Sequence, residues 1–213
     1  MSFSLPQKLL TEFIGTFFLS LTISVSVIHH EYEYMPFAIA STLMVVIYAG
    51  GHISGAHYNP AVTISVYLRG SCNKDDVLPY IASQILAAVI AALVADRFLT
   101  TKKYYDVELF TLGSEAVVAE FLFTFLLAYV ILNVATTESK SGNGYYGASI
   151  ALVVLAGAIT VGSISLASFN PAVTSALIIS GKISFSASWM HFLPQLVGAI
   201  LATYVYKFTM ENQ

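Results

Sequence analysis

Two copies of the tripeptide Asn-Pro-Ala carry the most specific chemistry in this sequence. They lie at Asn59-Pro60-Ala61 and at Asn170-Pro171-Ala172. Asparagine is among the preferred N-caps of a helix, and proline is favoured at the first helical position because its missing N–H would be unpaired there. Each tripeptide therefore predicts the start of a helix. Unpaired backbone N–H groups give such a start a partial positive charge.

The two helices that begin there are predicted to be too short to cross a bilayer. Residues 60–69 and 171–181 reach, at about 1.5 Å per residue, half of a ~30 Å hydrocarbon core. Gly/Ser-rich stretches at 50–55 and 162–165 precede them. We expect unwound backbone there, which is tolerated at membrane depth only inside protein or beside a watery cavity. The segments are thus predicted to be re-entrant half-helices. Their positive ends are expected to repel cations at mid-membrane. The asparagine NH₂ groups are expected to donate to water, which interrupts proton relay.

The composition is typical of a membrane protein. The 213 residues are 57% hydrophobic and 10% charged, whereas soluble domains carry about a quarter charged residues. An all-α fold is predicted, with six transmembrane helices and two re-entrant half-helices. The six long apolar stretches are 8–29, 36–51, 78–98, 115–135, 146–162 and 188–208. A net charge of −3 without a long basic run excludes a nucleic-acid partner.

The two halves of the chain repeat. The pattern Glu12-Phe13-x-x-Thr16 recurs as Glu120-Phe121-x-x-Thr124, and the Asn-Pro-Ala tripeptides recur with Gln84 and Gln195 in the same order. Each half holds three spans, an odd number, so the two copies must enter the membrane in opposite orientations. We predict a single transmembrane domain over 1–213, made of two inverted repeats at about 1–105 and 106–213.

Glu12 and Glu120 are carboxylates within apolar spans. An ionisable group there is costly and normally faces the bundle interior or a cavity. One interpretation is a proton relay or a cation site, as in a transporter. The other is an acceptor for the unpaired N–H groups of the re-entrant loops. Because each half has one loop and one glutamate, the second interpretation is favoured.

The segment from His52 to Thr63 closely resembles the first signature loop of the aquaporin (major intrinsic protein) family, and the segment from Ser165 to Ala172 resembles the second. The resemblance covers nearly the whole chain. It implies a passive channel for water and other small uncharged solutes, without a cofactor. It also implies a homotetramer in the plasma membrane or bacterial inner membrane, with both termini cytoplasmic. It places His57 near the cytoplasmic mouth of the pore and makes Glu12 and Glu120 the supports of the loops.

The sequence departs from this family at the outer selectivity filter. Most members have an arginine directly after the second Asn-Pro-Ala, where this chain has Val173. Counting from the motifs puts the other filter positions at Ile39, Ala158 and Ala167. Such a filter is aliphatic and uncharged: its small members widen the pore, whereas narrow hydrophobic constrictions dewet. We expect a wide, weakly selective filter. The remaining pore lining is expected from His57 and from a track of backbone carbonyls at Gly162, Ser163, Ile164 and Ser165.

Other function classes remain as alternatives. A secondary transporter needs a coupling site, and short loops with two buried carboxylates argue against one; liposome swelling without an ion gradient discriminates the two. A nonconducting junction protein would show no permeability. No metal site is expected at His52 and His57, which lack a third ligand nearby, and no constellation indicates an enzyme. Glycerol, urea, ammonia and hydrogen peroxide all stay open as solutes beside water.

Overall fold

Six long helices dominate the computed structural model, which describes residues 3–29, 33–100 and 109–210. All six are long and apolar enough to cross a membrane. They are α1 (Leu5–Ile28), α2 (Met35–Ser54), α4 (Lys74–Val94, continued by the π-helical turn η1, Ala95–Leu99), α5 (Ser114–Ala135), α6 (Tyr146–Ser165) and α8 (Trp189–Met210). The predicted all-α class with six spans is confirmed.

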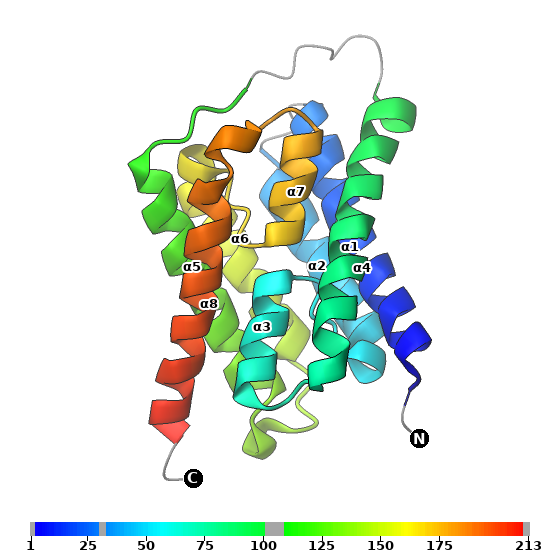
Figure 1. Cartoon of the computed structure of the whole chain (residues 1–213), viewed down its shortest axis with the longest axis vertical. Helices are drawn as coiled ribbons and strands as arrows, with labels where there is room; N and C mark the ends of the chain where they lie inside the picture. The colour runs from blue at the N-terminus through cyan, green and yellow to red at the C-terminus, as the bar shows by residue number, and fades with distance from the viewer. Residues whose placement is uncertain (1–2, 30–32, 101–108, 211–213) are drawn as a thin grey trace.

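Two half-helices, α3 (Pro60–Arg69) and α7 (Pro171–Ile179), occupy the space between the long helices. They lie end to end, with α7 above α3 in Figure 1. The second half-helix ends two residues earlier than predicted, because Gly181 takes a left-handed φ of 69° and turns the chain. Two single-turn 3₁₀ segments, η3 (Glu138–Lys140) and η4 (Phe185–Ala187), connect longer helices.

Small residues allow the helices to approach closely. A Cβ atom on Gly198 of α8 would overlap the backbone carbonyl of Phe121 on α5, so a larger side chain has no room there. On the other side of the bundle, Ala88 of α4 packs against Ala172 and Ala176 of α7. Membrane helices associate through such close contacts because lipid provides little hydrophobic driving force between them. The half-helices are therefore held by tightly packed neighbours.

The stretches before the half-helices are mostly helical, so the expectation of unwound backbone over all of 50–55 and 162–165 is wrong. Helix α2 continues to Ser54 and α6 continues to Ser165. The glycine at position 50 serves close packing instead of unwinding, since a Cβ atom on Gly50 would overlap the side chain of Tyr58. Irregular backbone is confined to 55–59 and 166–170.

Candidate functional site

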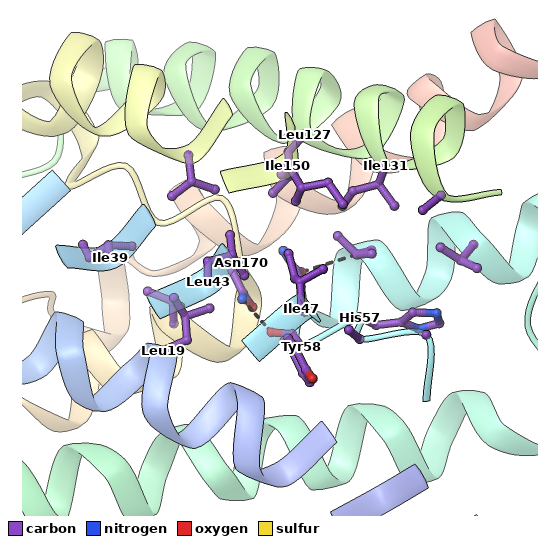
Figure 2. A pocket seen from close by; sticks show the side chains of 18 of the residues that line it. Leu19, Ile39, Leu43, Ile47, His57, Tyr58, Leu127, Ile131, Ile150 and Asn170 are labelled. Atoms are coloured by element: carbon purple, nitrogen blue, oxygen red, sulfur yellow. Dashed lines mark hydrogen bonds between the residues drawn. The ribbon is translucent and has the colours of Figure 1, made fainter. Parts of the chain in front are cut away.

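Two asparagines join the re-entrant loops at the centre of the molecule. The side-chain oxygen of each accepts the N–H of the alanine two residues ahead, at 2.9 Å, and so caps its own half-helix. Nδ2 of Asn59 donates to the carbonyl of Phe169 at 2.9 Å, and Nδ2 of Asn170 donates to the carbonyl of Tyr58 at 2.9 Å. The second of these bonds is the dashed line beside Asn170 in Figure 2. Each half-helix start is thus tied to the opposite loop.

Both loops hold residues in the left-handed backbone region. Ala56 and Tyr58 have φ values of 52° and 50°, and Ala167 and Phe169 have φ values of 48°. Left-handed backbone at residues other than glycine costs on the order of 1–3 kcal/mol each and persists only where the surroundings impose it. This conformation turns the Tyr58 and Phe169 carbonyls toward the opposite asparagines. The loops therefore need strong support from their neighbours.

Glu12 gives that support to the first loop. Its carboxylate is fully buried and accepts the backbone N–H groups of His57 at 2.9 Å and Tyr58 at 2.7 Å. The Ser54 hydroxyl donates to it at 2.6 Å and the Gln84 amide at 2.8 Å. Hydrogen bonds to an ionised acceptor are the stronger kind. One side chain on α1 therefore fixes the end of α2 and the loop before α3.

Glu120 makes the same four contacts in the second half. It is fully buried and accepts the N–H groups of Ser168 at 3.0 Å and Phe169 at 2.8 Å. The Ser165 hydroxyl donates to it at 2.6 Å and the Gln195 amide at 2.7 Å. Both glutamates thus accept the loop N–H groups, one loop each.

A cavity of about 320 Å³ passes both asparagines. Figure 2 shows Ile39 and His57 on opposite sides of Asn170 along this space. Most of the lining is aliphatic and comes from α1, α2, α5 and α6. Its members include Leu19, Ile23, Val27, Leu43, Ile47, Leu127, Ile131, Ile150 and Val154. Near the two asparagines, the polar lining groups come from the re-entrant loops, with His57 and Ser168 among them. A solute at this level therefore meets aliphatic side chains of the long helices together with polar groups of the loops.

All four predicted filter residues line this cavity. Ile39 and Val173 are almost fully buried, and none of the four carries a charge or a side-chain hydrogen-bond donor. The other two are Ala158 and Ala167. The four residues come from α2, α6, the second loop and α7, and the fold brings them to one cavity. Their role as a filter stays a prediction.

The expected lining from 162–165 is only partly found. Gly162 lines the cavity, whereas Ser163, Ile164 and Ser165 are not among its lining residues. The reason is that α6 stays helical to Ser165, so the backbone is not unwound there, and the Gly162 carbonyl accepts the N–H of Leu166 at 2.9 Å. The Ser165 hydroxyl faces Glu120, and Ile164 is exposed on the outside of the bundle.

His57 lines the cavity and is packed in place. Its ring lies edge-on to Tyr80 with 5.3 Å between centroids, and Nδ1 is 3.2 Å from the Thr63 hydroxyl. Within 3–29, 33–100 and 109–210, no group of three His, Cys, Asp or Glu side chains is placed to hold a metal ion.

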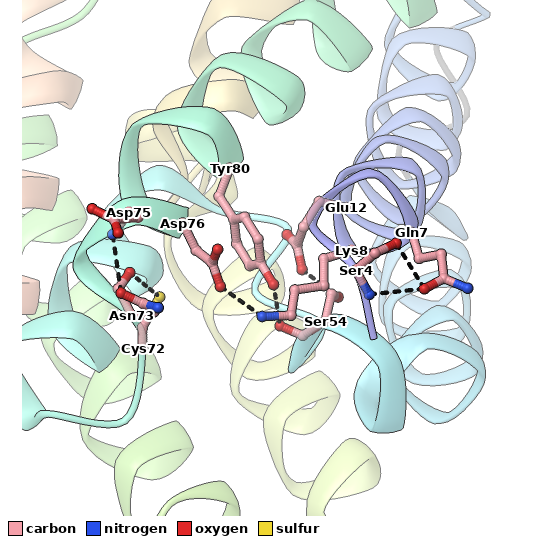
Figure 3. A network of polar contacts seen from close by, with 10 residues as sticks. All are labelled: Ser4, Gln7, Lys8, Glu12, Ser54, Cys72, Asn73, Asp75, Asp76 and Tyr80. Atoms are coloured by element: carbon pink, nitrogen blue, oxygen red, sulfur yellow. Dashed lines mark hydrogen bonds and ion pairs between the residues drawn. The ribbon is translucent and has the colours of Figure 1, made fainter. Parts of the chain in front are cut away.

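The lower mouth of the cavity contains charged residues that sequence reasoning did not select. We define the lower mouth by Lys8, Cys72, Asn73, Asp76 and Tyr80, all of which line the cavity on the side where α1 begins. Lys8 Nζ lies 2.7 Å from Asp76 Oδ2, as Figure 3 shows. In the sequence, Lys8 and Asp76 are single charged residues near the ends of two spans. Because they are 68 positions apart, no local pattern predicts that they pair.

The thiol at this mouth is expected to react slowly at neutral pH. Burial raises the pKa of the Cys72 thiol to about 11; the Asp76 carboxylate adds to the rise and the Lys8 ammonium opposes it. Because the thiolate is the nucleophile, labelling of this sole cysteine by a methanethiosulfonate reagent should accelerate about tenfold per pH unit up to the pKa. Asp76→Asn should speed labelling at pH 8 and Lys8→Gln should slow it. Wild-type labelling rates in both variants would contradict the placement of these two charges beside the thiol.

The six spans, the cross-bonded half-helices and the cavity beside them define a polytopic membrane protein of the channel type. The family model described as major intrinsic protein matches residues 1–160 and, a second time, 116–213. Aquaporin NIP1-2 of Arabidopsis thaliana is 34% identical, over 97% of this chain and 76% of its own length. Aquaporin NIP1-4 of Oryza sativa subsp. japonica is 30% identical, over 97% and 78%. The chain therefore belongs to the major intrinsic protein family.

A solved structure supports the same fold. The aquaglyceroporin from Plasmodium falciparum superposes with a TM-score of 0.80 at 20% identity, over 97% of each chain. Membership of this family makes the chain a passive membrane channel for water, for other small uncharged solutes, or for both. The family consists of channels and not of enzymes.

Proposed function

We propose that the cavity is the pore of this channel, and that it passes small uncharged solutes larger than water together with water itself. The observation that carries the proposal is the aliphatic set Ile39, Ala158, Ala167 and Val173, all on the cavity wall. Two alanines and a valine leave space where a guanidinium would fill it. Glycerol and urea are the best solutes to test the proposed width of the pore at this position.

Exclusion of ions falls, in this proposal, on the junction of α3 and α7. Each half-helix start carries a partial positive charge, because the peptide dipoles of the helix are aligned and end there. An asparagine NH₂ group has two N–H donors, and the bond to the opposite loop uses one of them. Asn59 and Asn170 both line the cavity, so the second donor is available to a passing water. Water molecules that accept from both asparagines point their own hydrogens away from the junction, which interrupts proton relay.

We also propose that the chain is built from two inverted repeats, at about 1–105 and 106–213. The matching contacts of Glu12 and Glu120 with serine, glutamine and two loop N–H groups support this division. The two overlapping matches of the family model support it as well.

The family resemblance supports a homotetramer with one pore per subunit, with both chain ends on the cytoplasmic side of a plasma membrane or bacterial inner membrane. Large apolar side chains on the outside of the bundle suit lipid or a neighbouring subunit. Among them are Leu10, Phe18, Leu122, Ile159 and Tyr204.

Val173→Arg tests the proposed filter. A guanidinium on this buried wall position narrows the cavity and adds five N–H donors. We expect glycerol and urea permeability to fall at least about tenfold, an added barrier of ~1.4 kcal/mol. Water permeability should stay within about threefold, since water fits a narrow polar constriction. Stopped-flow light scattering on proteoliposomes without any ion gradient measures all three solutes.

Val173→Leu is the matched control, because it adds bulk at the same position without adding donors. We expect it to reduce glycerol permeability less than arginine does. Unchanged permeability ratios in Val173→Arg would show that position 173 is not part of the filter.

A further inference from the structure

The lower mouth carries the formal charges of the cavity wall. Of the described residues that line the cavity, Lys8 and Asp76 are the two with charged side chains. They come from the first turns of α1 and α4 and meet at 2.7 Å. The upper part of the cavity, around Ile39 and Val173, offers aliphatic side chains instead. The strongest side-chain hydrogen-bonding groups that a solute meets are therefore at the end opposite the proposed filter.

Both side chains of the ion pair have further hydrogen-bonding groups that are available to a solute. Lysine has three N–H donors, and a carboxylate has two oxygens. In the part of the chain that the structure describes, the pair uses one N–H of Lys8 and one oxygen of Asp76 on each other. The Lys8 side chain is 27% exposed and the Asp76 side chain 11% exposed, so both are partly desolvated. Charge-assisted hydrogen bonds are stronger than neutral ones, and partial desolvation strengthens them further.

The contacts around the pair separate it from the support of the loop. Tyr80, one turn beyond Asp76 on α4, donates to the carbonyl of Ser54 at 2.9 Å. The Ser54 hydroxyl in turn donates to Glu12, one turn beyond Lys8 on α1. Figure 3 shows these contacts side by side with the ion pair. Because Tyr80 and Glu12 hold the first loop without using either charged side chain, the pair can be replaced while the loop keeps its bonds.

The ion pair is not expected to serve the stability of the fold alone at this position. A partly buried pair loses hydration on both ions, and apolar side chains of similar size are often as stable. Charged residues in membrane proteins that face a cavity commonly belong to a solute path. The exposure of both side chains to the cavity fits a task in solute passage.

We propose that Lys8 and Asp76 form a solute-binding site at the lower mouth, which takes small uncharged molecules with hydroxyl or amide groups. Lys8 donates to an oxygen of the solute, and the second oxygen of Asp76 accepts one of its O–H or N–H groups. The site replaces water of hydration before the solute enters the aliphatic part of the pore. This inference rests on the proposed function, since it needs a pore that passes such solutes.

The test replaces both charges by apolar side chains of similar size, in Lys8→Met with Asp76→Leu. Stopped-flow measurements on proteoliposomes compare water, glycerol and urea. We expect the glycerol-to-water and urea-to-water permeability ratios to fall about tenfold, the loss typical of a hydrogen bond to a charged group. Lys140→Met is the control, because Lys140 lies in η3 and is not among the residues that line the cavity.

A folded double variant whose ratios stay within about twofold of wild type would overturn the site. If the double variant does not fold, Lys8→Gln and Asp76→Asn decide the question by the same ratios, since each removes one charge and keeps a polar side chain. Both single variants must lower the ratios if the site exists. A wild-type channel that passes neither glycerol nor urea would instead overturn the proposed function, so the two failures are distinguishable.

Discussion

Glu120→Gln is expected to destabilise the folded channel by about 3–5 kcal/mol, the usual range for breaking a buried charged network, and to leave little solute flux. Four donors converge on this carboxylate: two loop N–H groups, the Ser165 hydroxyl and the Gln195 amide. Glutamine offers one oxygen and one NH₂ group, so at least one buried donor would face another donor. The left-handed backbone at Phe169 would then lose the contact that holds it.

This loss of stability is measured by heating the protein in detergent and monitoring its unfolding by size-exclusion chromatography. Glu115→Gln is the control on the same helix, because Glu115 is exposed at the start of α5 and its side chain contacts Ser114. Glu12→Gln should behave as Glu120→Gln does, since it removes the same four contacts from the first loop. A Glu120→Gln protein that unfolds within about 2 °C of wild type would show that the carboxylate does not support the loop.

The starts of the half-helices were predictable because their signals are local. An N-cap asparagine followed by proline specifies a helix start whatever the rest of the fold does. Both starts lie where the sequence predicts them, at Pro60 and Pro171. Glu12 and Glu120 were predictable for a different reason, since a carboxylate inside a span must find donors.

The ends of α2 and α6 were not predictable from the same signals. A run that contains Gly50 and Gly51 has a low helix propensity, yet α2 continues to Ser54. Gly50 is needed for the approach of Tyr58, a contact that depends on how the loop folds back. Tertiary packing decides such a case, and glycine propensity does not.

The hydrogen bonds between the two re-entrant loops are even harder to predict from the sequence. Asn59 and Phe169 are 110 positions apart, and the bond between them needs left-handed backbone at a phenylalanine. Left-handed backbone is normally signalled by glycine. At Tyr58 and Phe169 the conformation is held by the backbone N–H bonds that Glu12 and Glu120 accept. The same holds for Lys8 and Asp76, whose pairing appears only after α1 and α4 are packed.

Asn59→Asp is expected to raise proton and cation leak at least about tenfold, because a carboxylate at the junction attracts the cations that the half-helix starts repel. The aspartate retains the cap on α3, since aspartate is as good an N-cap as asparagine. It loses the N–H that donates to Phe169, and a carboxylate oxygen then faces a carbonyl oxygen. Asn170→Asp should have the same effect at the carbonyl of Tyr58.

A pH-sensitive dye inside proteoliposomes, with a potassium diffusion potential to drive protons, measures the leak beside water flux. Asn143→Asp is the control, because it makes the same change on the loop between α5 and α6, at a residue that does not itself line the cavity. If the barrier lay at the aliphatic filter instead of the junction, both variants and the double variant would conduct protons no faster than wild type while water still passed. The two asparagines would then be structural ties between the loops, and ion exclusion would have to come from dehydration along the apolar wall.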